Sequence, residues 1–121
     1  MTSAEAAFQS ALQRDPDYID AWVNIGIIFA KQRRFDGAIT AFEKALEYEP
    51  ESPKLHNNLA LAYKQKGVAL HSMGDKKEAL ELFMKSKTHY ERALSLSPEY
   101  EEAMRNFSGL TPWLENREQK P

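Results

Sequence analysis

Residues 21–50, AWVNIGIIFAKQRRFDGAITAFEKALEYEP, decide the fold of this 121-residue chain. Large apolar residues recur three and four positions apart, as Trp22, Ile25 and Phe29 do, and this spacing places them on one face of a helix. A second run with the same spacing begins near residue 38, and small residues such as Gly26 stand within both runs. Two antiparallel helices whose backbones approach at small residues account for this pattern. The stretch therefore predicts a helical hairpin.

The hairpin pattern recurs on both sides of this stretch. Pro16, Pro50 and Pro98 each end an amphipathic run, and the second interval between them is longer than the first. The aligned positions before the prolines are Ala4, Ala38 and Ser86, then Phe8, Phe42 and Tyr90, then Ala11, Ala45 and Ala93, then Leu12, Leu46 and Leu94. Those after the prolines are Ala21, Leu55 and Ala103, then Asn24, Asn58 and Asn106, then Ile25, Leu59 and Phe107, then Gly26, Ala60 and Ser108. We therefore predict an all-α repeat protein with helices at about 3–14, 19–33, 36–48, 53–73, 75–96 and 99–109.

Three of these helices begin with a capping signal. Ser52 and Ser97 each precede a proline, which combines an N-cap residue with proline at the first helical position. Asp75 and Glu78 have the spacing of a capping box.

The repeat after Pro50 is longer than the one before it by two heptads, and two glycines compete to end its first helix. Apolar and small positions continue at heptad spacing beyond Gly67, and they do so on the facing helix as well. We therefore predict that Gly67 is a helix-contact residue, that Gly74 forms the turn, and that each helix gains one heptad. The tip of this hairpin is expected to project beyond the neighbouring repeat.

Residues 21–50 resemble a tetratricopeptide repeat (TPR). The motif positions that match are Trp22, Ile25, Gly26, Phe29, Ala38, Phe42, Ala45 and Pro50, whereas His56 replaces the usual aromatic residue in the following repeat. The resemblance implies a right-handed superhelical array of antiparallel helix hairpins, that is, a TPR-like α-solenoid. It divides the chain into one domain at 1–110, with a partial repeat at 3–18, a repeat at 19–52, an extended repeat at 53–98 and a terminal helix at 99–110, followed by a tail at 111–121. Trp113 and Leu114 of the tail are expected to pack back on the last helix.

Composition excludes several classes of function. The formal charge is −2 with acidic and basic residues interspersed, which argues against nucleic-acid binding and membrane insertion, and the chain has no cysteine for a disulfide or thiolate metal site. His71 and His89 would lie about 16 Å apart along the extended hairpin and could not share a metal ion. We expect no enzyme activity and no cofactor, and we take a soluble, cytoplasmic protein as the default.

The asparagine position is the strongest functional signal. In arrays of the kind the resemblance implies, Asn24, Asn58 and Asn106 face the concave groove, where amides can grip the backbone of an extended peptide or the surface of a helix. The alternative is that these asparagines bond to neighbouring helices. The predicted groove residues are Asp20, Asn24, Ile27, Lys31, Lys54, Asn57, Asn58, Leu61, Gln65, Arg105 and Asn106.

Two other functions stay open at this point. The chain starts with what the resemblance makes the second helix of a hairpin, so we expect a piece of a longer array or an end that pairs with another chain. A homo-oligomer could form there and at the extended tip, where the candidate contacts are Val68, Leu70, Met73 and Met84. The repeats could also be appended to an enzyme elsewhere in a longer chain.

Overall fold

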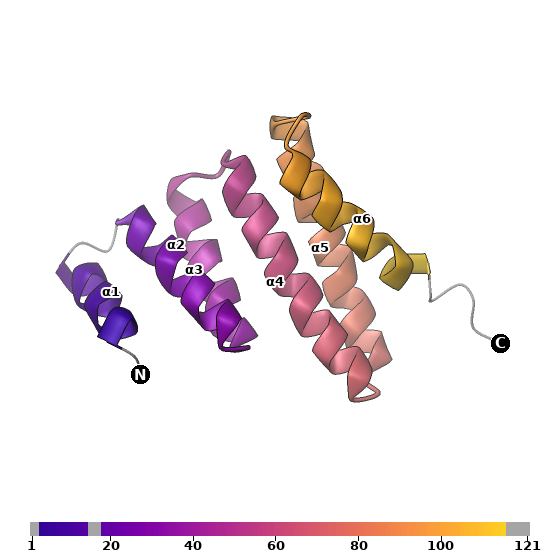
Figure 1. The fold of residues 1–121 in the computed structure, drawn as a ribbon, viewed down its shortest axis with the longest axis horizontal. Helices are drawn as coiled ribbons and strands as arrows, with labels where there is room; N and C mark the ends of the chain where they lie inside the picture. The colour runs from indigo at the N-terminus through magenta and orange to yellow at the C-terminus, as the bar shows by residue number, and fades with distance from the viewer. Residues whose placement is uncertain (1–2, 15–17, 116–121) are drawn as a thin grey trace. The chain divides into compact units, whose positions relative to one another are not determined.

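The computed structural model describes residues 3–14 and 18–115, and all regular structure within those ranges is α-helical (Figure 1). The chain divides into two compact units, Met1–Glu51 and Ser52–Pro121. Unit 1 contains α1 (Ser3–Arg14), α2 (Ile19–Lys31) and α3 (Phe35–Tyr48). Unit 2 contains α4 (Pro53–Ser72), α5 (Lys76–Leu96) and α6 (Glu101–Glu115). The all-α class and the predicted helices are confirmed. The single domain expected at 1–110 stays a prediction.

In unit 1, α2 and α3 form the predicted hairpin. A Cβ atom added at Gly26 of α2 would lie 2.6 Å from the ring of Phe42, so the absence of a side chain at Gly26 lets the two helices approach. The turn places Arg33 at a φ of 60°, and the Arg34 backbone N–H donates to the Phe29 carbonyl at 2.8 Å. This is a Schellman-type helix end in which arginine occupies the position that usually belongs to glycine.

Unit 2 contains the extended hairpin, with both helices lengthened as predicted. A Cβ at Gly67 would lie 2.6 Å from the buried ring of Phe83, and Gly74 forms the turn with a φ of 89°. Gly67 and Phe83 thus repeat, one heptad along each helix, the contact that Ala60 and Tyr90 occupy in the alignment. In the middle of the hairpin, the Ser86 hydroxyl donates to the Ala60 carbonyl at 2.7 Å.

The last helix extends further than predicted and covers the extended hairpin. α6 continues through Pro112 to Glu115, so residues 111–115 are not a tail, while residues 116–121 lie outside the described ranges. The helix adds Leu110, Trp113 and Leu114 to a cluster that includes Phe83 and Tyr90, and Val68 and Leu70 pack against the same cluster. The added turns of the hairpin are therefore covered by α6 within this unit.

One of the three capping predictions is confirmed. The Ser52 hydroxyl accepts a hydrogen bond from the Leu55 backbone N–H at 3.2 Å, with Pro53 at the start of α4. Asp75 is the N-cap residue of α5 but its side chain makes no capping bond. Ser97 is not the N-cap of α6, because its N–H still donates to the Ala93 carbonyl at 2.9 Å and it therefore closes α5.

Two further predictions concern residues beyond this description. The side chains of Phe8 and Leu12, which carry the apolar face expected for α1, lie outside the described part of the structure, as do residues 15–17 with Pro16.

Among the helices that the structure does describe, none has the length and apolar character needed to cross a bilayer.

Candidate functional site

A stripe of four side chains runs along α2 of unit 1. Its members are spaced four, three and four residues apart, which aligns them along one side of a helix. Asp20, Asn24 and Lys31 are exposed and Ile27 is half-buried. The predicted groove residues of this unit therefore form one continuous accessible surface, which we call the α2 stripe.

The equivalent residues of α4 form the α4 stripe in unit 2. Its members have the same spacing: Lys54 is exposed, and Asn58, Leu61 and Gln65 are half-buried. The amide nitrogen of Asn58 and the amide oxygen of Gln65 are buried and meet no hydrogen-bond partner within the described part of the chain. The α4 stripe thus contains an unused donor and an unused acceptor, and a buried polar atom without a partner destabilises the folded state.

Asn57 departs from its prediction as an accessible groove residue, because its side chain is fully buried. Its amide nitrogen donates to the Glu102 carboxylate at 3.1 Å, and its amide oxygen accepts from the amide of Asn106 at 3.1 Å. Both bonds join α4 to α6. Burial and the charge of Glu102 raise the pKa of Tyr100 beside this junction, and a hydrogen bond with Asn57 offsets part of that rise.

The three aligned asparagines consequently play different parts. Asn24 is exposed on α2, Asn58 has an unpaired amide nitrogen on α4, and Asn106 donates to Asn57 within the protein. Arg105, next to Asn106, is exposed and pairs with Glu101 along α6 at 3.9 Å. The alternative of bonding to a neighbouring helix therefore describes Asn106, whereas Asn24 and Asn58 keep the amide groups that a partner could use.

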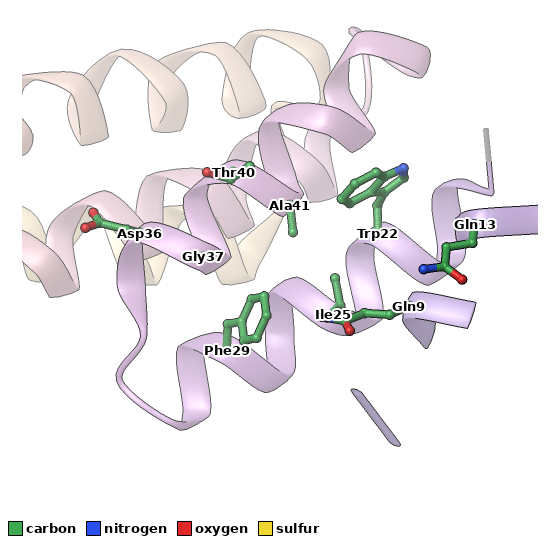
Figure 2. A pocket seen from close by; sticks show the side chains of 9 residues that line it. All are labelled: Gln9, Gln13, Trp22, Ile25, Phe29, Asp36, Gly37, Thr40 and Ala41. Atoms are coloured by element: carbon green, nitrogen blue, oxygen red, sulfur yellow. The ribbon is translucent and has the colours of Figure 1, made fainter. Parts of the chain in front are cut away.

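An open pocket of about 540 Å³ lies in unit 1, and sequence reasoning missed it (Figure 2). Trp22, Ile25 and Phe29 of α2 form one wall, and none of the α2 stripe residues takes part. The described residues that line it are Gln9, Gln13, Trp22, Ile25, Phe29, Asp36, Gly37, Thr40 and Ala41. The pocket therefore combines an apolar and aromatic wall with polar side chains, as ligand pockets commonly do.

A second feature that sequence reasoning missed is a pair of histidines in unit 2. The Nδ1 atoms of His56 and His89 lie 3.0 Å apart in a hydrogen bond, and the two rings stack with centroids 5.2 Å apart. Tyr63 also stacks on His89, with ring centroids 5.8 Å apart, and the Lys85 ammonium lies 5.6 Å from the Tyr63 ring centroid. The available signal was that His56 occupies the aromatic Trp22 position of the alignment.

The tip residues proposed for self-association separate into two kinds. Val68 and Leu70 pack against the cluster beneath α6, so they are not free tip contacts. Met73 and Met84 keep 72% and 39% exposure. Only the two methionines therefore remain as candidate contacts at the tip.

The arrangement of metal-ligating side chains was a further question for the site. In the described ranges, no group of three or more His, Asp or Glu side chains gathers where it could hold a metal ion. His71 contacts the edge of Trp113, with ring centroids 5.2 Å apart, and is remote in sequence from the His56 and His89 pair.

Three family models match the chain and overlap along it. One described as "TPR repeat" matches residues 28–67, and two described as "Tetratricopeptide repeat" match residues 2–45 and 60–100.

Curated relatives include peroxisomal targeting signal receptors of yeasts. The receptor of Candida albicans is 36% identical over 67 residues, which cover 55% of this chain and 11% of that protein. The receptor of Saccharomyces cerevisiae is 24% identical over 129 residues, which cover 93% of this chain and 21% of that protein. The chain thus spans about a fifth or less of the length of these relatives.

Two solved structures are also similar. The crystal structure of MamA has a TM-score of 0.45 and 17% identity, covering 96% of this chain and 90% of that one. The NMR structure of the first TPR domain of human RPAP3 has a TM-score of 0.41 and 25% identity, covering 88% of this chain and 99% of that one.

Proposed function

Because the chain belongs to the tetratricopeptide-repeat family, we propose that it is a non-enzymatic scaffold that binds another protein, with the α2 stripe as the binding surface of unit 1 and the α4 stripe as that of unit 2. The observation that supports this proposal most strongly is that the two stripes present the same types of side chain in the same order along their helices. Each has a charged residue, an asparagine, a branched aliphatic residue and a polar residue, in equivalent positions of equivalent helices.

The chemistry of the stripes suits the backbone of an extended segment. An asparagine amide both donates and accepts hydrogen bonds, so it can pair with a peptide group whatever the side chain. The Asn58 amide nitrogen is buried and donates to no described residue, so the side chain can turn toward a partner without breaking a hydrogen bond. Ile27 and Leu61 offer apolar contacts next to the amides, and the differing charges of Asp20 and Lys54 would set selectivity.

The names of the curated relatives agree with this class of partner. They are called receptors for a targeting signal. By analogy with that name, we propose that the partner of this chain is a segment of another protein.

The test begins with a displayed library of random extended peptides, selected on the full chain. The library includes peptides that end in Ser-Lys-Leu, a peroxisomal address, because of the relatives' names. For the tightest selected peptide, Asn24→Ala and Asn58→Ala are each expected to raise Kd about fivefold to tenfold, since each removes about 1 kcal/mol of hydrogen bonding. Fluorescence anisotropy of the labelled peptide measures this.

Asn106→Ala is the matched control, because it makes the same chemical change at the aligned position. Its amide is used within the protein, so it should lower the melting temperature while changing Kd less than twofold. If Asn24→Ala and Asn58→Ala bind the peptide as the parent chain does, the stripes are not the binding surface.

A further inference from the structure

The last helix, α6, has an open face that the corresponding helices of the two hairpins bury. In the repeat alignment, Ser108 of α6 corresponds to Gly26 of α2 and Ala60 of α4. Gly26 and Ala60 are buried, because α3 packs on α2 and α5 packs on α4 to form the hairpins. Ser108 is exposed, and Met104, one turn before it, is 42% exposed. No helix among the described residues covers this face of α6.

The first helix, α1, corresponds to the second helix of a hairpin. Its Ala7 aligns with Ala41 of α3 and His89 of α5. The ring of His89 stacks on those of His56 and Tyr63 in α4, with ring centroids 5.2 Å and 5.8 Å apart. This position therefore faces the first helix of its own hairpin, and Ala7 marks the same face on α1.

That face of α1 is open as well. In α3, Ala41 is 2% exposed and Ala45, one turn later, is 0% exposed. Their counterparts in α1 are Ala7, which is exposed, and Ala11, which is half-buried. Thus α1 has an open face that fits a first helix, and α6 has an open face that fits a second helix.

We propose that α6 of one copy of this chain packs against α1 of a second copy, so that the two helices complete a hairpin of the α2–α3 kind. The antiparallel arrangement of such a hairpin brings the end of α1 beside the beginning of α6. Arg14 is a basic residue in the last turn of α1, and Glu101 and Glu102 are acidic residues in the first turn of α6. These opposite charges favour a second copy as the occupant and set the direction of packing.

The α1 and α6 faces are different surfaces, so the contact is heterologous and leaves one open face at each end of a pair. Association should therefore continue beyond two copies. Because α1 has only 12 residues, the contact should bury less than the roughly 1,200 Å² of a stable interface, and it should be weak. The weight-average mass should rise from that of one chain at about 10 µM to that of two or more chains at about 1 mM.

Two variants of exposed residues block one face each. Ala7→Arg places a large cation on the open face of α1, and Ser108→Arg does the same on α6. Each variant alone should keep the mass of one chain, because one side of every contact is blocked. An equimolar mixture should form pairs and stop there, since Ala7→Arg keeps a working α6 and Ser108→Arg keeps a working α1. Sedimentation equilibrium of the full-length proteins measures these masses.

Met73→Arg is the matched control. Met73 is 72% exposed at the tip of the extended hairpin and belongs to neither face. The variant should associate as the parent chain does. Circular dichroism should show the helix content of the parent chain in all three variants.

A disulfide cross-link tests the register of the contact. The chain has no cysteine, so each introduced cysteine is the only one present. Ala7 and Met104 correspond to His89 and His56, whose rings stack in unit 2. Under mild oxidation, a mixture of Ala7→Cys and Met104→Cys should therefore form the mixed disulfide several times faster than a mixture of Ala7→Cys and Met73→Cys.

Four results would overturn the proposal. The parent chain could keep the mass of one copy at the highest concentration, or Ala7→Arg or Ser108→Arg alone could associate as the parent chain does. The mixture of these two variants could fail to form pairs. Loss of association in Met73→Arg would move the contact to the tip of the extended hairpin.

Discussion

At the scale of single residues, the glycines of unit 2 show how contact rather than propensity decides stability. Gly67 lies inside α4, where glycine costs about 1 kcal/mol relative to alanine. Its position against Phe83 explains why glycine stands there, since an added Cβ would approach the ring to 2.6 Å and Phe83 is only 2% exposed.

Gly67→Ala is therefore expected to destabilise unit 2 by about 1–2 kcal/mol, because overpacking outweighs the gain in helix propensity. Gly109→Ala is the matched control in α6, where the nearest atom to an added Cβ is the Lys64 Nζ at 3.7 Å. That variant should stabilise the unit by about 0.5–1 kcal/mol. Urea denaturation followed by circular dichroism measures both, and a stabilised Gly67→Ala variant would contradict the packing described for the extended hairpin.

The buried hydroxyl of Tyr90 gives a prediction about pH. Burial raises the pKa of Tyr90 above its ordinary value, so the folded chain keeps its proton at a pH where the unfolded chain loses it. The stability that follows from this is fully present below about pH 10 and falls by up to about 1.4 kcal/mol per pH unit above it.

Tyr90→Phe should make the loss of stability above pH 10 less steep. At pH 7 the same variant should be neutral or slightly stabilising, because the hydroxyl is buried and no described residue pairs with it at hydrogen-bonding geometry. Thermal unfolding between pH 7 and 11 tests both statements. A slope above pH 10 equal to that of the parent chain would show that Tyr90 ionises in the folded protein.

At the scale of the helices, the long hairpin and the long last helix belong together. The one-heptad extensions of α4 and α5 place Phe83 and Val68 in the cluster that α6 covers, and α6 contributes Leu110 before Pro112 and Trp113 after it. The ring of Trp113 lies 5.4 Å from that of Phe83 and 5.2 Å from that of His71. The terminal helix is therefore a structural part of the extended repeat.

Trp113→Ala should consequently lower the stability of unit 2 by about 2 kcal/mol, less than for a fully buried tryptophan because the ring is half-buried. Amide hydrogen exchange should rise selectively in the second half of α4, near residues 67–72. Glu115→Ala, at the exposed end of the same helix, should change neither quantity. Equal exchange in Trp113→Ala and the parent chain would mean that α6 does not protect the extension.

Helix positions were predictable because period and turn chemistry are local properties of the sequence. Gly67 and Gly74 were assigned correctly, since heptad spacing continues on both facing helices. The end of α6 was not predictable, because Pro112 normally limits a helix and tertiary contacts of Trp113 maintain this one.

At the scale of the whole molecule, the repeat alignment found the predicted groove residues but could not separate their roles. Asn57 and Asn106 bond to each other because α4 and α6 lie side by side, and one sequence contains no signal for that pairing.

If Asn24 and Asn58 hold a partner segment, NMR of their side-chain amides will detect the contact. On addition of the selected peptide to the ¹⁵N-labelled full chain, the NH₂ signals of Asn24 and Asn58 should shift and saturate together, while that of Asn57 stays in place because it already bonds Glu102. Saturable binding that leaves the Asn24 and Asn58 signals unmoved would show that these asparagines do not hold the segment.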